Sequence, residues 1–186
     1  MLLPKMSGVM RMYEKLNSLK KRLQQMKQNR TTRQNGQTFH FFPFSKKQKQ
    51  VLTWWCKESP VHDKDGIIAD GAIRSGKTVS MSLSFVMWAM SSFAGQNFAM
   101  CGKTIGSFRR NVLFWLKLML RSRGYSITDH RADNLVVVRK NGIENYFYIF
   151  GGKDERSQDL IQGITLAGVF FDEVALMPES FVNQAT

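Results

Sequence analysis

Residues 71–78 read GAIRSGKT, and this stretch restricts the possible fold more than any other part of the chain. It matches G-x-x-x-x-G-K-[ST] in full, the Walker A pattern of phosphate-binding loops (P-loops). Its two glycines let the backbone curl tightly, so that successive N–H groups point inward. Apolar IIAD (67–70) precedes the loop and VSMSLSFVMWAM (79–90) follows it. The pattern predicts a strand over 67–70, then the loop, then a helix over 77–92.

Each residue of this loop is a candidate ligand for the phosphates of ATP. The backbone N–H groups, together with the positive end of the following helix, suit an anion. We expect Lys77 to reach the β- and γ-phosphates and the Thr78 hydroxyl to bind Mg²⁺. The predicted nucleotide-binding residues of the loop are Gly71, Ala72, Ile73, Arg74, Ser75, Gly76, Lys77 and Thr78.

The arginine inside the loop, Arg74, has three possible roles. Its guanidinium is suited to stabilising charge on the γ-phosphate in the transition state, which makes it a candidate catalytic residue. Pairing with an acidic neighbour and projection into solvent are the alternatives. Arg156, in GGKDERSQD, is a second arginine that is suited to contacting nucleotide in its own or a neighbouring subunit.

A second candidate site lies in GVFFDEVALMPE (168–179), where an apolar run ends in two acids. A strand that ends at Asp172 can place this carboxylate near the Mg²⁺ held by Thr78, as a Walker B motif does. Glu173 then becomes the candidate general base that polarises the attacking water. An acidic pair at the end of a surface strand is the alternative, and the loop upstream favours the catalytic interpretation.

The remaining pattern alternates strands with helices, which predicts an α/β fold with a mainly parallel sheet. Asn141-Gly142 between two apolar runs predicts a β-hairpin. Strands are predicted over 97–101, 134–139, 144–152 and 167–171, and helices over 45–56, 105–124 and 157–163.

The chain is strongly basic, with 27 Lys and Arg against 14 Asp and Glu and a formal net charge of +13. This excess favours a polyanionic partner, either nucleic acid or an anionic membrane surface; a basic domain without such a partner is the alternative. Residues 1–38 contain one acid, Glu14, among many basic residues. They predict a basic amphipathic helix over 8–28 and a linker over 31–38, which either contact DNA or a partner or remain solvated.

Two cysteines without a CxxC pair, no signal peptide and no apolar stretch long enough to span a bilayer indicate a cytoplasmic protein without membrane contact. Basic residues on the predicted helix over 105–123 are suited to DNA phosphates and show no pattern for reading bases. These residues are Arg109, Arg110, Lys117 and Arg121.

Three segments in a fixed order resemble a known family. They are FPFSKKQKQVLTWW (42–55), GAIRSGKT, and GGKDERSQDLIQGITLAGVFFDEVALMPESFVNQA (151–185). Together they resemble the N-terminal ATPase domain of the large terminase subunit of tailed bacteriophages, in the branch found in defective prophages of Gram-positive bacteria. The resemblance covers about residues 39–186, and residues 151–185 are its most specific part.

The resemblance implies a RecA-like ATPase, in which ATP hydrolysis with Mg²⁺ drives double-stranded DNA through a portal protein into a procapsid. It implies P-loop roles for Lys77 and Thr78, a metal-binding role for Asp172 and a catalytic role for Glu173. Family members bind adenine with an upstream glutamine, for which Gln48 is the best match and Gln50 the next; a helix surface position is the alternative. Phe42 or Phe44 would pack nearby or in the core. The resemblance also implies a small terminase subunit as a partner and assembly of the chain into a homo-oligomeric ring. The implied location is the bacterial cytoplasm.

The sequence departs from the family pattern in two places. The basic extension 1–38 is not part of it, and the chain ends at Thr186, before the coupling segment and the C-terminal nuclease domain of the family. The ATPase core is therefore expected to be incomplete at its C-terminus, with a gap between the strand over 67–70 and the strand that ends at Asp172. We expect the chain alone to be poorly stable or to turn over ATP hardly at all. Another P-loop DNA translocase of the helicase type, or a non-catalytic prophage remnant, is the alternative function.

Overall fold

The computed structural model describes residues 43–72, 74–153 and 161–186. Three sets of predictions lie outside these residues: those for the basic extension 1–38, those for Phe42 and Ile73, and that for Arg156. The predicted helix over 157–163 is described only at its end, where Ile161 and Gln162 are helical.

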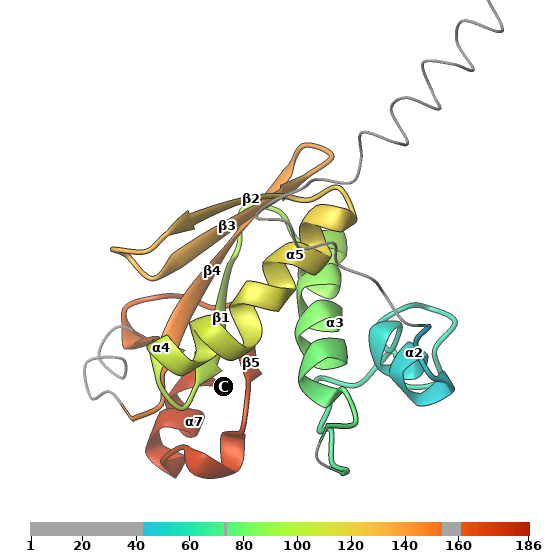
Figure 1. The fold of residues 1–186 in the computed structure, drawn as a ribbon, viewed down its shortest axis with the longest axis horizontal. Helices are drawn as coiled ribbons and strands as arrows, with labels where there is room; N and C mark the ends of the chain where they lie inside the picture. The colour runs from blue at the N-terminus through green and yellow to red at the C-terminus, as the bar shows by residue number, and fades with distance from the viewer. Residues whose placement is uncertain (1–42, 73, 154–160) are drawn as a thin grey trace, which may run out of the picture. The chain divides into compact units, whose positions relative to one another are not determined.

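A five-stranded sheet runs through the centre of the described part of the chain, in the order β2-β3-β4-β1-β5 (Figure 1). Strand β1 pairs in parallel with both β4 and β5, whereas β3 pairs antiparallel with both β2 and β4. Four of the strands therefore run in one direction, which confirms the α/β fold with a mainly parallel sheet. The strands are β1 (Asn97–Gly102), β2 (Ser126–His130), β3 (Leu135–Lys140), β4 (Ile143–Gly151) and β5 (Gly168–Phe171).

The predicted β-hairpin is confirmed by β3 and β4. Asn141 and Gly142 connect them with φ values of 51° and 81°, the left-handed conformation that a two-residue hairpin turn requires. Strand β2 extends the hairpin and is not predicted by the sequence. Its residues alternate between exposed and half-buried, and SITDH carries a single aliphatic residue, so the sequence shows no apolar period there.

Helix α3 (Lys77–Ser92) has the bounds that the sequence predicts. Its side chain Phe85 makes ring contacts with Phe98 of β1, Phe147 of β4 and Phe170 of β5, at centroid distances of 5.8, 6.2 and 5.9 Å. Each such pair stabilises the packing by about 0.5–1.5 kcal/mol beyond the apolar area that it buries. Helix α3 is thereby fixed across the three parallel strands, and its first turn lies beside the end of β5.

The predicted helix over 105–124 is present, but its hydrogen-bonding pattern changes along its length. It begins as α4 (Ile105–Phe108), widens into a π-helical turn (Arg109–Leu113) and continues as α5 (Phe114–Ser122). Phe108 and Leu116 are buried, whereas Trp115 is 43% exposed, so Leu116 rather than Trp115 belongs to the buried face. The helix ends before Gly124, as predicted, with Gly124 at φ 80°.

The second face of the sheet is covered by a separate apolar cluster. It contains Ala99 and Cys101 of β1, which alternate with Phe98 and Met100 on the α3 side. Phe181 of α7 (Glu179–Ala185) is fully buried in this cluster. The sheet is therefore packed on both faces, as a parallel sheet requires.

Two sequence predictions need correction. Residues 67–70 do not form a strand, and Ile68 is 94% exposed. A strand needs a paired neighbour, and in the described residues β5 pairs only with β1 and leaves its other edge without one. The predicted helix over 45–56 is shorter, since α2 spans Lys46–Leu52 after its N-cap Ser45. Of the helices described, none combines the length and the apolar character needed to cross a membrane.

Candidate active site

The structure brings together the two motifs that the sequence singles out. Thr78 lies in the first turn of α3, and Asp172 directly follows β5. The Thr78 hydroxyl donates a hydrogen bond to Asp172 Oδ1 at 3.0 Å, although 94 residues separate them in the chain. The backbone N–H of Asp172 donates to the carbonyl of Cys101 at 2.8 Å, which fixes the carboxylate to the end of β1.

The environment of Asp172 is unusual for a carboxylate. Burial raises the pKa of Asp172 above its ordinary value; the Thr78 hydrogen bond partly offsets this, and the neighbouring charge of Glu173 adds to it. A positive charge close to Asp172 would therefore be favourable.

Lys77 is folded back onto the loop of residues 71–76. Its ammonium group donates to the carbonyl of Gly71 at 2.5 Å and to that of Ala72 at 2.7 Å. The N–H of Gly71 in turn donates to Asp70 Oδ1 at 2.7 Å. The lysine thus holds the loop closed through the carbonyls at its start.

The two remaining candidate catalytic residues have strained backbones. Arg74 and Glu173 both adopt left-handed conformations, with φ values of 62° and 60°, and both are exposed. For a residue with a side chain this conformation costs about 1–2 kcal/mol. Glu173 begins a 3₁₀ turn (Val174–Leu176) beside Asp172, whereas the neighbour of Arg74, Ile73, lies outside the described residues.

The glutamine predicted upstream of the loop lies against it. Gln48, in the first turn of α2, donates from Nε2 to the carbonyl of Ser75 at 3.1 Å. Gln50 is exposed, and Phe44 is half-buried just before α2. The structure therefore brings Gln48 to the loop, while its contact with adenine stays a prediction.

The oxygen atoms of Thr78 and Asp172 fit a magnesium ion. Mg²⁺ prefers oxygen donors and is commonly bound by one or two carboxylates together with phosphate oxygens of a nucleotide. Over residues 43–72, 74–153 and 161–186, no three His, Cys, Asp or Glu side chains gather as a metal site would require. The hydroxyl and carboxylate, 3.0 Å apart at the start of α3, are the donor set that the described residues offer.

Comparison with known proteins identifies the family. A family model, Terminase large subunit, T4likevirus-type, N-terminal, matches residues 68–185. The chain belongs to this family. It is 72% identical to the large terminase of a thermophilic bacteriophage, with a TM-score of 0.76, over 77% of this chain and 36% of that one. No protein with a curated description matches.

The large terminase of that thermophilic phage has also been solved with nucleotides. The structure in complex with ADP matches at 70% identity with a TM-score of 0.73, and the one in complex with ATP-gamma-S at 67% with 0.71. Each match covers 77% of this chain. This terminase chain spans about a third of the length of those proteins.

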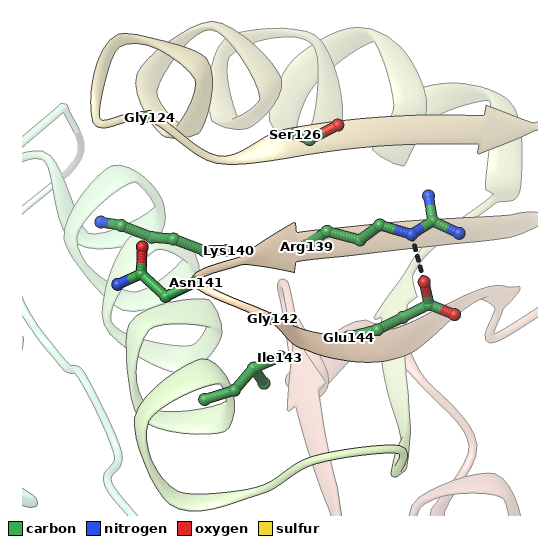
Figure 2. Close-up of a pocket in the computed structure, with 8 residues that line it drawn as sticks. All are labelled: Gly124, Ser126, Arg139, Lys140, Asn141, Gly142, Ile143 and Glu144. Carbon is green, nitrogen blue, oxygen red and sulfur yellow. Dashed lines mark hydrogen bonds and ion pairs between the residues drawn. The ribbon is translucent and has the colours of Figure 1, made fainter.

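A cavity of about 370 Å³ lies at the turn between β3 and β4. Its lining includes Arg139, Lys140 and Glu144, which are drawn in Figure 2. Two of these lining residues, Arg139 and Glu144, form an ion pair. The turn precedes β4, so the cavity lies at the amino end of the parallel strands, whereas Asp172 follows the carboxyl end of β5. The cavity is therefore separate from the candidate active site.

An ion cluster in the terminase chain was missed by sequence reasoning. Asp129 of β2 accepts from Arg109 at 2.8 Å and from Lys117 at 2.6 Å, and all three side chains are largely buried. Burial raises the pKa of Asp129, but hydrogen bonds and charge from Lys117 and Arg109 outweigh it and lower this pKa below its usual range. Two of the four helix cations expected to face DNA phosphates therefore pair within the fold, while Arg110 is exposed.

Proposed function

We propose that this chain supplies the ATP-hydrolysing part of a phage DNA-packaging motor. The observation that carries the proposal is the contact of Thr78 with Asp172 at the first turn of α3, beside a complete Walker A loop. The nucleotides bound to the large terminase of the thermophilic phage support it.

Each residue of the site has a separate role in the proposed ATP hydrolysis. The N–H groups of loop 71–76 and the positive end of α3 bind the phosphates. Lys77 exchanges its bonds to the loop carbonyls for bonds to phosphate oxygens. Thr78 and Asp172 hold Mg²⁺, which when bound neutralises charge on the phosphate oxygens. Glu173, which is exposed and directly follows Asp172, takes a proton from the attacking water. The water oxygen bonds to the γ-phosphorus as the bond to the ADP oxygen breaks.

Arg74 is proposed to stabilise the charge that develops on the γ-phosphate. Its left-handed backbone supports this role, since strained conformations are concentrated at functional sites. The position of Arg74 in the loop is also compatible with an ion pair to an acidic neighbour. Replacing Arg74 by an uncharged residue distinguishes the two roles, because only the catalytic role predicts a direct loss of ATP turnover.

The proposed motor acts on double-stranded DNA in the bacterial cytoplasm, with a portal protein, a small terminase subunit and copies of itself in a ring. The net charge of +13 supports contact with the DNA backbone. Exposed Arg110 is the helix residue proposed for such a contact. DNA affinity should fall steeply with added salt, and an affinity that ignores salt would count against this part of the proposal.

The test is binding of ATP-gamma-S with Mg²⁺, followed by ATP turnover with and without double-stranded DNA. We expect Lys77→Ala to abolish binding, and Glu173→Gln to retain binding while lowering any measurable turnover by about a hundredfold or more. Glu58→Gln, an exposed acid outside the site, is the matched control. Binding that survives Lys77→Ala would refute the proposal, as would turnover in the wild-type chain that Glu173→Gln leaves unchanged.

A further inference from the structure

The side chain of Gln48 connects helix α2 to the phosphate-binding loop. We propose that Gln48 is a positioning residue, which holds the loop in the shape that receives a triphosphate, whatever base the ligand carries. This inference rests on the proposed function, because it concerns how the same loop binds its ligand.

Both ends of the Gln48 amide are engaged. Oε1 accepts a hydrogen bond from the N–H of Ser45 at 2.9 Å, and Nε2 donates to the carbonyl of Ser75 at 3.1 Å. The Ser45 hydroxyl accepts from the N–H of Gln48 at 3.3 Å, which completes a capping box at the start of α2. One amide therefore ties the first turn of a helix to the loop 27 residues further along the chain.

The same amide lies over the last glycine of the loop. A Cβ atom added to Gly76 would lie 2.6 Å from Gln48 Nε2, far closer than such atoms approach. Gly76 has φ 82° and immediately precedes Lys77, the first residue of α3. Gln48 thus contacts the loop at the two residues, Ser75 and Gly76, whose conformation sets the direction of Lys77.

Helix α2, which carries Gln48, is itself held against α3. The hydroxyl of Ser84 in α3 donates to the carbonyl of Val51 at 2.6 Å. Trp54, just after α2, packs against Trp88 of α3 with ring centroids 6.2 Å apart. Since α2 is fixed to α3, a bond from Gln48 fixes the loop relative to the helix whose first turn carries Lys77 and Thr78.

Recognition of adenine would use the same two atoms of the amide, each of which can form two hydrogen bonds. A glutamine reads adenine by accepting from the N6 amino group with its oxygen while donating to N7 with its nitrogen. In Gln48 the oxygen serves the capping box and the nitrogen serves Ser75. The bonds to Ser45 and Ser75 occupy one acceptor site and one donor of the amide, so both can persist whether or not a base is bound. The contact of Gln48 with the loop is therefore independent of the base.

The experiment measures binding of three probes to the full chain with Mg²⁺: ATP-gamma-S, GTP-gamma-S and inorganic tripolyphosphate. Gln48→Met keeps the length of the side chain and removes both amide ends, and we expect it to weaken all three probes alike, by about fivefold for a lost hydrogen bond. Ser45→Ala is the matched control, because it removes one bond of the capping box and leaves the bond to Ser75. It should bind the three probes as the wild-type chain does.

Hydrogen exchange of the ligand-free chain supplies a second readout. Gln48→Met should speed exchange of the backbone N–H groups of loop residues 74–77, whereas Ser45→Ala should not. A loss confined to ATP-gamma-S would assign Gln48 to adenine and overturn the inference, as would equal losses in the two variants, which would trace the effect to the helix cap. Unchanged binding and exchange in Gln48→Met would also overturn it. A wild-type chain that binds none of the probes refutes the proposed function instead, and the exchange comparison still decides the positioning role.

Discussion

Asp129 is the residue whose loss should destabilise this fold most directly among its charged groups. Its carboxylate lies in β2 with 13% of the side chain exposed, and it accepts from both Arg109 and Lys117, which are each 17% exposed. The π-helical turn makes this possible. In a regular α-helix residues 109 and 117 would project about 80° apart, and the wider turn reduces that offset so that both cations reach one carboxylate.

The perturbation is Asp129→Asn, which keeps the shape and removes the charge. Two neighbouring cations would then remain largely buried without an anion. Breaking a buried ion pair by removing one partner costs about 3–5 kcal/mol. Because the asparagine oxygen still accepts a hydrogen bond and the site retains some exposure, we expect a loss of about 2 kcal/mol in the free energy of unfolding. For a chain of this size that corresponds to a fall in Tm of about 4–8 °C.

The assay is denaturant or thermal unfolding followed by circular dichroism, with Asp63→Asn as the control. Asp63 pairs with Lys64 at 3.2 Å, but their side chains are 60% and 63% exposed, so its loss should change stability by less than about 0.5 kcal/mol. Asp129→Asn that lowers stability no more than Asp63→Asn would refute the argument that the cluster stabilises the fold.

The pH dependence gives the same reasoning a second test. The folded-state pKa of Asp129 is lowered, so its contribution is fully present above the unfolded value of about 3.9 and is lost as pH falls through the folded pKa. The difference between the wild-type chain and Asp129→Asn should therefore shrink only in acid, below about pH 4. If the difference in unfolding free energy between the wild-type chain and Asp129→Asn disappeared between pH 5 and 8, the assignment of this contribution to ionised Asp129 would be wrong.

Three further outcomes follow from the fold. Asn145→Ala should cost about 3 kcal/mol, because Asn145 is fully buried and its amide bonds three backbone groups; a loss under 1 kcal/mol on unfolding would contradict this. Iodoacetamide at pH 8 should modify Cys56 and spare Cys101, since burial raises the pKa of the Cys101 thiol to about 12; mass spectrometry of peptides gives the result, and equal rates would refute it. Gly76→Ala should abolish tripolyphosphate binding, because a Cβ atom strains the left-handed backbone of residue 76 and collides with Gln48. Affinity retained in calorimetry would contradict this and would show that the loop adjusts to the added atom.

The elements that the sequence predicts well are those with strong local signals. Helix α3, β1 and the β3–β4 hairpin combine an apolar run with a turn residue that fixes one boundary. Strand β2 pairs with β3 but has no apolar period of its own, and the π-helical turn has no local sequence signature, so neither was predicted.

In the candidate site too, only the contacts between residues of recognised motifs could be predicted. The meeting of Thr78 with Asp172 could be predicted, because each lies in a motif and the carboxyl end of β5 sits at the edge of the sheet where α3 begins. The hydrogen bond of Gln48 to Ser75 could not, since a glutamine in KKQKQ carries no sign of its partner. The pairing of Arg109 with Asp129 was hidden for the same reason, and it turns a residue expected at the surface into one that holds the π-helical turn to β2.

The segment before the loop explains why the contact from α2 matters. Residues 67–70 form no strand, so in the described part of the chain the start of the loop is held by short-range bonds, from Asp70 to Gly71 and from Lys77 to the carbonyls of Gly71 and Ala72. The bonds from Lys77 are the ones that phosphate oxygens would replace. Once Lys77 turns to the ligand, Gln48 still ties Ser75 of the loop to α2, and Thr78 ties the residue after Lys77 to Asp172. A strand added beside β5 would give 67–70 a paired neighbour and hold the loop from its other end, and the effect of Gln48→Met on exchange of the loop should then diminish.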